Sequence, residues 1–208
     1  MRALCLVGMS GIGKSHWSER LVREAGYTRH DCDGDIAARL STIVPVAPGE
    51  SPVNALGVWM GMPWSAGYAA REARYLALEE EVTREALEAA RAGAGPQVLD
   101  TTGSVIYLSP PLLAAIRETC RVVYLRTPER WREAMLERYR TDPKPVVWSG
   151  AFTADDAAAP SASLPARFAE LLRLRDARYA ALADTVLDGA GLEANDPGVA
   201  GFLAACGS

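Results

Sequence analysis

Residues 8–15 read Gly-Met-Ser-Gly-Ile-Gly-Lys-Ser, the pattern of a phosphate-binding loop in which two glycines enclose four residues and Lys-Ser follows directly. An apolar run at residues 3–7 precedes the loop, and residues 17–22 (Trp-Ser-Glu-Arg-Leu-Val) continue as a candidate helix. A strand before the loop and a helix after it are the context that this motif requires. The stretch therefore predicts an α/β fold organised around a phosphate site.

Each residue type in this loop suits a bound polyphosphate. Glycine lets the backbone curve and bring its N–H groups close to the ligand. Lys14 places a compact charge on the outer phosphates, and Ser15 offers its hydroxyl to Mg²⁺. We expect ATP, or alternatively GTP, with magnesium, held also by the positive end of the following helix. The residues expected to touch the nucleotide are Gly8, Ser10, Gly11, Ile12, Gly13, Lys14, Ser15 and His16.

The length and charge of the chain limit its function classes. We expect the 208 residues, 1–208, to form a single domain, since this length suits one hydrophobic core. The net charge is −4 and basic residues are scattered, so no nucleic-acid partner is expected. The loop begins too early for a signal peptide, and no apolar stretch approaches the ~20 residues of a membrane span. We expect a cytoplasmic monomer or homodimer with no membrane partner.

Short apolar runs alternate with helical stretches along the chain. Residues 69–91 repeat apolar side chains at helical spacing, and a further helix is expected from Thr127-Pro128 until just before Asp142. This alternation predicts a parallel sheet covered by helices. The expected strands lie at residues 5–7, 27–31, 98–100, 122–125 and 185–187.

Two segments break the alternation. Residues 41–67 are rich in Pro, Gly, Met and Trp and are too apolar for a solvated linker. Residues 141–165 contain four prolines among Ala, Ser and Asp, which is the composition of a mobile loop. We expect the first segment to be an insert of the acceptor region and the second to be a lid over the nucleotide. Trp59 in the insert is a candidate acceptor contact, with ordinary core packing as the commoner explanation.

Aspartates end two of the apolar runs. In an extended chain Asp31 and Asp33 point to the same side, so one is a candidate for holding hydrated Mg²⁺ and the other for orienting an acceptor hydroxyl. The alternative is an acidic turn that caps the next helix, a role that Asp35 fits better. Asp100 is a second candidate for organising magnesium, with a strand-ending turn as its alternative. Thr102 and Gly103 behind it are candidates for lining the acceptor pocket.

The order of these motifs resembles the shikimate kinase family. The resemblance rests on the phosphate loop, on Asp31-x-Asp33 followed by Ile36, on residues 78–82 (Leu-Glu-x-Glu-Val), on residues 103–105 (Gly-Ser-Val), on residues 144–147 (Lys-Pro-Val-Val) and on Arg175-x-x-x-Tyr179 with Ala183-Asp184. It spans nearly the whole chain. It implies a five-stranded parallel sheet with helices on both faces, which is the three-layer fold of the P-loop NTPases.

The resemblance also implies roles for single residues. It implies Asp31 near magnesium, Asp33 at the acceptor hydroxyl, Lys144 over the nucleotide phosphates and Arg175 on an acceptor anion. Two departures argue against shikimate itself as the acceptor. Leu76 stands where the family has an arginine for the acceptor carboxylate, and residues 101–103 read Thr-Thr-Gly where the family has three glycines.

Together these features predict a small-molecule kinase that transfers the γ-phosphoryl group of ATP to a hydroxyl. A nucleoside or nucleotide kinase, in which the aromatic insert stacks a base, is one alternative. A nucleotide-binding switch or ATPase without a small acceptor is another. The expected catalytic residues are Lys14, Asp33 and Lys144, the expected magnesium residues are Ser15, Asp31 and Asp100, and the expected acceptor residues are Asp33, Thr102, Gly103, Arg175 and Trp59.

Overall fold

All five predicted strands form in a computed structural model of the chain, which describes residues 2–153 and 159–207. They pair in parallel in the order β2-β3-β1-β4-β5, which confirms the predicted five-stranded sheet. β1 lies in the centre, where the order of strands reverses and where open sheets of this kind bind ligands. The strands are β1 (Ala3–Val7), β2 (Thr28–Asp31), β3 (Gln97–Asp100), β4 (Cys120–Arg126) and β5 (Thr185–Asp188).

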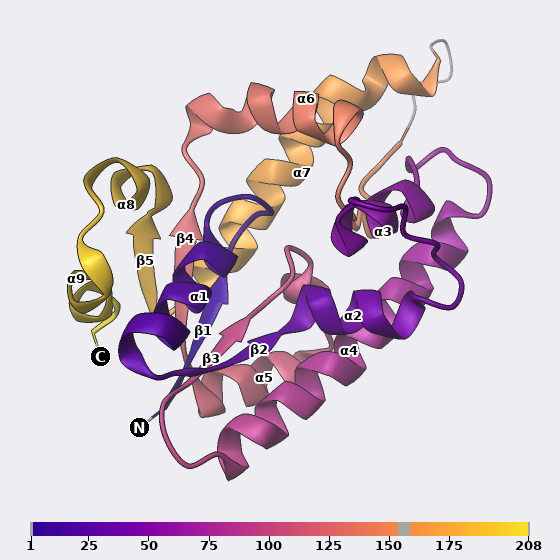
Figure 1. Cartoon of the computed structure of the whole chain (residues 1–208). Coiled ribbons are helices and arrows are strands. Elements are labelled where there is room, and N and C mark those ends of the chain that lie inside the picture. The colour runs from indigo at the N-terminus through magenta and orange to yellow at the C-terminus, as the bar shows by residue number, and fades with distance from the viewer. Residues whose placement is uncertain (1, 154–158, 208) are drawn as a thin grey trace.

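Alternating side chains of the central strands contribute to two hydrophobic cores, one on each face of the sheet. Cys5 and Val7 point into the larger core, while Leu4 and Leu6 point into the smaller one. Figure 1 shows the resulting layers of helix, sheet and helix. The larger core is covered by α4 (Tyr68–Ala92), α5 (Pro110–Thr119) and α7 (Pro160–Leu182), and the smaller by α1 (Lys14–Ala25) and α9 (Gly198–Cys206), which follows α8 (Gly189–Asn195).

The two long helical predictions agree with the structure, with one shifted boundary. α4 covers the predicted 69–91 stretch and buries Tyr75, Val82 and Ala86. The later helix begins after Thr127: a short 3-10 turn, η2 (Glu129–Trp131), precedes α6 (Arg132–Thr141). Thr127 therefore does not cap this helix. Within the described ranges, none of the helices combines the length and apolar character that a membrane crossing needs.

The 41–67 insert packs against the start of the expected lid. It follows α2 (Cys32–Leu40) and contains α3 (Pro52–Met60), whose Asn54 Nδ2 donates to Asp142 Oδ1 at 2.5 Å across 88 residues of chain. Gly57 of α3 lies so close to residues 143–144 that a Cβ atom would stand 2.1 Å from the Pro143 carbonyl oxygen. The two irregular segments therefore form one packed unit.

The 141–165 segment is a loop over only part of its expected length. α6 extends to Thr141 and α7 begins at Pro160, because proline is well suited to the first turn of a helix. Residues 154–158 of the expected lid lie outside the described residues. We call residues 142–153 the lid segment.

Side chains from two helices hold the backbone of the lid segment. Tyr68 Oη donates to the Val146 carbonyl at 2.7 Å, and Glu72 Oε1 accepts from the N–H groups of Trp148 and Ser149 at 2.5 and 2.9 Å. Arg175 Nη2 of α7 donates to the Val147 carbonyl at 2.7 Å. Because these bonds fix the backbone on its carboxyl side and α3 fixes it on the amino side, Lys144 is held between two anchors.

Replacing Gly57 with Ala tests the packing of α3 on the lid segment. Alanine normally favours a helix over glycine by ~1 kcal/mol, but here its methyl group would overlap the Pro143 backbone. We expect G57A to lower the free energy of unfolding by about 1–3 kcal/mol in urea denaturation. V58A, at the exposed next position, should change it by less than about 0.5 kcal/mol. A stabilised G57A protein would contradict the close packing.

Candidate active site

The phosphate loop lies at the carboxyl end of β1 and has the backbone geometry that its glycines allow. Gly8 has a φ of 149°, and a Cβ atom there would lie 2.7 Å from the Leu125 carbonyl oxygen. Lys14 is buried, and its Nζ donates to the carbonyls of Gly8 and Met9 at 3.0 and 3.1 Å. Burial lowers the pKa of Lys14, and the carboxylates of Asp100 and Asp33 oppose that shift. The ammonium group thus lies at the loop with carbonyl oxygens as its direct partners.

A cavity of about 810 Å³ opens between the phosphate loop, α6, the lid segment and α7. Its volume falls in the range of pockets that take small ligands, roughly 300–1,000 Å³. Of the predicted nucleotide contacts, Gly8, Lys14 and Ser15 do not line it. The predicted residues that do line it are Ser10, Gly11, Ile12, Gly13, His16, Gly103, Lys144 and Arg175.

Two cationic side chains reach the cavity from the side of α6 and the lid segment. Lys144 is exposed and lines the cavity, and its charge contributes to lowering the pKa of Lys14. Arg138 of α6 lies over the phosphate loop, because a Cβ atom on Gly11 would stand 3.5 Å from Arg138 Nη1. Sequence reasoning missed Arg138. Several arginines occur on this helix, and only the packed position of the helix selects the one that faces inward.

Arg175 is a buried cation on the α7 side of the cavity. Arg175 is 5% exposed, and its Nε atom has no hydrogen-bond partner within the described part of the chain. The guanidinium lies over the Tyr107 ring at 5.5 Å, and Nη1 faces Gly103, where a Cβ atom would lie 3.6 Å away. No carboxylate forms an ion pair with it among the described residues. A buried guanidinium with open N–H donors is suited to an anionic ligand group.

The two aspartates at the end of β2 do not share one side of a strand as predicted. β2 ends at Asp31 and α2 starts at Cys32, so Asp33 lies in the first turn of a helix. Asp31 is the N-cap, accepting from the Gly34 N–H at 3.0 Å, and the assignment of this role to Asp35 was wrong. Asp33 Oδ1 accepts from Tyr75 Oη at 3.2 Å, and burial raises the pKa of Asp33 to about 6.

Glu79 of α4 is a fully buried carboxylate that received no role from its position in the sequence. Its oxygens accept from the hydroxyls of Thr102 and Ser104, the latter at 2.5 Å. Burial raises the pKa of Glu79 to about 7, against the opposing effect of these two bonds. Thr102, predicted to face the acceptor, instead directs its hydroxyl to Glu79. The only signal in the sequence was the match of residues 78–82 to the family pattern.

Trp59 does not line the cavity that Arg175 lines. Its half-buried ring packs against the larger core, and the neighbouring Met60 is fully buried there. Trp64 is partly exposed and lies against the Phe152 ring of the lid segment, with 5.3 Å between ring centroids. Asp33 is also absent from the residues that line the cavity. The structure thus gives Trp59 the core-packing role that was its alternative.

The two aspartates of the predicted magnesium site are bound by an arginine side chain. Asp31 and Asp100 are direct partners in the parallel pairing of β2 and β3. Arg29 Nη2 lies 2.6 Å from Asp100 Oδ2 and 3.3 Å from Asp31 Oδ2. Ser15, by contrast, is exposed at the start of α1. Asp31 and Asp100 therefore do not fit a magnesium ion in this arrangement, and no group of three or more acidic, His or Cys side chains in the described residues is arranged for a metal.

Comparison with known proteins gives matches among solved structures only. No protein-family model matches the sequence, and no curated protein matches it. Shikimate kinase from Acinetobacter baumannii in complex with shikimate is similar over 90% of this chain and 83% of its own, with 21% identity and a TM-score of 0.60. The chain has the fold of the shikimate kinases.

Two further structures extend this comparison. Shikimate kinase from Bacteroides thetaiotaomicron matches over 98% of this chain and 97% of its own, with 17% identity and a TM-score of 0.62. The Deinococcus radiodurans tunicamycin resistance protein matches over 98% and 95%, with 18% identity and a TM-score of 0.50. The resemblance that the motifs predicted is thus confirmed for the fold.

The raised pKa of Glu79 predicts how stability depends on pH. The folded protein binds this proton more tightly than the unfolded chain, whose carboxyl has a pKa near 4.5. The contribution of Glu79 to stability is therefore fully present below about pH 4.5 and is lost as the pH rises to about 7, and Asp33 contributes in the same direction. For Glu79 the loss is on the order of 3 kcal/mol, measured as the change between pH 4.5 and 8 in the difference between the free energies of unfolding of the wild-type protein and a variant that lacks this carboxyl group.

The variant E79Q should lose most of that dependence, because an amide does not ionise. At pH 8 it should be more stable than the wild-type protein, and at pH 4.5 the two should be similar. E88Q, at an exposed position of α4, should keep the wild-type dependence. Equal pH dependence in E79Q and wild type would contradict the buried, protonatable state of Glu79.

Proposed function

We propose that the protein is a kinase that transfers the γ-phosphoryl group of ATP to a hydroxyl of a small metabolite. The supporting observation is the cavity in which the phosphate loop faces Arg138, Lys144 and Arg175. A triphosphate carries several negative charges close together, and phosphoryl transfer is accelerated mainly by positioning and by neutralising that charge. A loop of backbone N–H donors opposite Arg138 and Lys144 supplies both.

The roles proposed for the nucleotide side follow from where the charges lie. The loop N–H groups and the start of α1 would hold the phosphates. Lys14 Nζ, now bonded to carbonyl oxygens of the loop, would turn its donors to the outer phosphates. Lys144 and Arg138 would neutralise the phosphates from the opposite wall. Mg²⁺ would enter as part of the nucleotide substrate, close to the exposed hydroxyl of Ser15.

Asp33 is the proposed group for orienting the acceptor hydroxyl and taking its proton. A catalytic base works best when its pKa is near the working pH, and burial raises the pKa of Asp33 to about 6. Tyr75 fixes one of its oxygens, and the charge of Lys14 favours its ionised form. Arg175, beside Gly103, is the proposed contact for an anionic group of the acceptor.

The acceptor is expected to differ from shikimate. The similar Acinetobacter kinase was solved with shikimate, whereas this chain has Leu76, half-buried against the core, where the family resemblance places a carboxylate-binding arginine. Losing a charge-assisted bond to a carboxylate typically costs about 1.5–3 kcal/mol of binding. Near Gly103, the hydroxyls of Thr102 and Ser104 are bonded to Glu79. The leucine in place of that arginine favours an acceptor without a carboxylate at this position.

Nucleotide binding is the first test of this proposal. Calorimetry should detect ATP binding by the wild-type protein, and K14A should weaken it by about ten- to hundredfold, the equivalent of losing one or more charged hydrogen bonds. R173A, at an exposed position of α7 outside the cavity, should bind ATP like the wild type. A K14A protein with unchanged ATP affinity would remove the central assignment.

Acceptor dependence is the second test. ADP release should rise when one member of a panel of hydroxylated metabolites is added, and shikimate should give little or no increase. With that acceptor, D33N should reduce turnover by about 10²- to 10⁴-fold, because an amide cannot take the proton of the acceptor hydroxyl. ATP binding by D33N should be normal. D35N, at the exposed position one half-turn further along α2, should retain turnover. Acceptor-independent ADP release without a phosphorylated product would identify an ATPase or switch, and turnover with nucleosides or nucleotides only would identify the alternative kinase class.

A further inference from the structure

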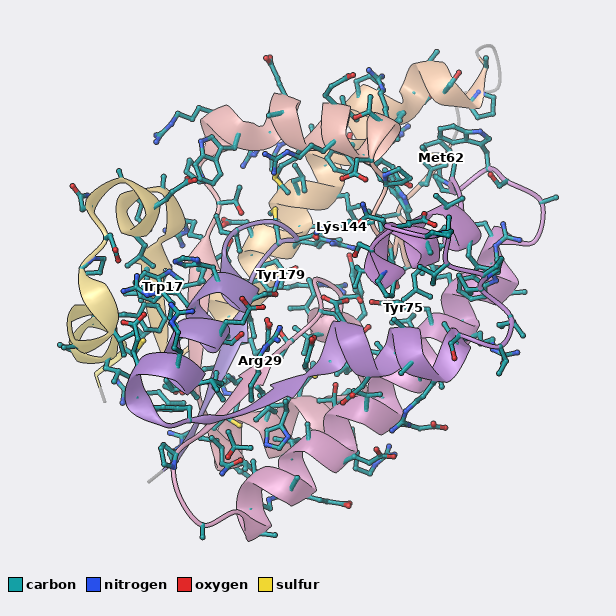
Figure 2. The ribbon with its side chains drawn as sticks, in the orientation of Figure 1. Trp17, Arg29, Met62, Tyr75, Lys144 and Tyr179 are labelled. Carbon is teal, nitrogen blue, oxygen red and sulfur yellow. The ribbon has the colours of Figure 1, made fainter. Side chains whose placement is uncertain are left out.

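Arg29 sits at the point where the family resemblance implies a metal, and it contacts carboxylates from three elements. It extends from β2, and its side chain is 20% exposed. Nε and Nη2 both donate to Asp100 Oδ2, at 3.2 and 2.6 Å, while Nη2 lies 3.3 Å from Asp31 Oδ2. Nη1 lies 3.6 Å from Glu19 Oε1 of α1. Figure 2 shows Arg29 below Lys144 and Tyr179 in the view.

The sheet itself creates the need for a cation at this point. Asp31 and Asp100 are paired in register, and neighbouring strands lie about 4.8 Å apart, so two carboxylates meet at the strand ends. Like charges at this spacing repel one another. Asp100 is 3% exposed, so water cannot screen its charge. Some positive group must therefore stay beside this pair whenever both are ionised.

A guanidinium can meet this need in the way that a hydrated metal ion would. The water molecules around a Mg²⁺ ion would donate O–H hydrogen bonds to carboxylate oxygens, and Arg29 donates two N–H hydrogen bonds to Asp100 Oδ2. Unlike a lysine, it also keeps its charge at every working pH and has a planar fork of donors. Ser18 Oγ supplies a further bond to Asp100 Oδ2 at 3.0 Å.

We infer that Arg29 supplies the positive charge that compensates the carboxylates of Asp31 and Asp100, and that these carboxylates do not hold a divalent metal ion in this protein. Any divalent ion would then enter with the nucleotide and be held by its phosphates and the loop. Arg29 is accordingly a positioning residue: it fixes Asp100 against β2 and α1 and sets the charge of the site. This inference concerns the protein without nucleotide and stands or falls separately from the proposed kinase activity.

The test measures direct binding of Mn²⁺, as a probe for divalent ions, to nucleotide-free protein by electron paramagnetic resonance. The wild-type protein should show no bound Mn²⁺ at concentrations where R29M binds one ion. R29M should gain affinity of about tenfold or more, because affinity follows the number of uncompensated oxygen ligands. The double variant R29M/D31N should lose that gain.

A matched control separates the site from a general charge effect. R39M also releases two carboxylates, Glu81 and Glu85, but on the exposed surface between α2 and α4, and should gain no Mn²⁺ affinity. A folded R29M protein without a new Mn²⁺ site would overturn the inference. Should R29M not fold, the wild-type protein still decides: Mn²⁺ bound without nucleotide and lost in D31N would overturn it, and absence of such binding would support it.

Discussion

Parallel pairing of the strands is the constraint on which the rest of this structure depends, because it brings every strand end to one edge of the sheet. The phosphate loop, Asp31 and Asp100 meet there although the chain separates them widely. The protein must then balance charge in a small, poorly hydrated volume. It does so by three means: Arg29 pairs with two carboxylates, Lys14 binds backbone carbonyls, and burial raises the pKa of Asp33 and Glu79.

A second constraint connects α3 with the lid segment. Gly57 of α3 touches the backbone of residues 143–144, so the insert that borders α2 and the segment that carries Lys144 are in direct contact. On the other side, Glu72 and Arg175 bind the backbone of residues 147–149. Since close-packed contacts transmit displacement, a shift of α3 would be transmitted to the backbone of Lys144. The position of Lys144 is therefore linked to the packing of α3.

The sequence predicted those features that depend on neighbours along the chain. Strand runs, the glycine-rich loop and α4 follow from local patterns, and the structure confirms them. The features it did not predict depend on neighbours in space. Asp31 is the N-cap because the strand ends there, two residues before the end of the extended stretch 31–33 that the prediction required. The inward turn of Arg138, the Arg29 bridge and the Asn54–Asp142 contact each need a partner far along the chain.

The low identity to solved structures of the same fold has a physical explanation. The fold requires alternating apolar side chains in the strands and glycine where backbones approach, as Gly8 approaches Leu125, and many sequences satisfy these requirements. The side chains around the strand ends are not constrained in that way. Arg29 and the Thr102–Glu79 bond set the charge and the donors at the strand ends without taking part in the pairing of the strands. The backbone thus constrains the phosphate loop, whereas the side chains around the strand ends can vary within the same fold.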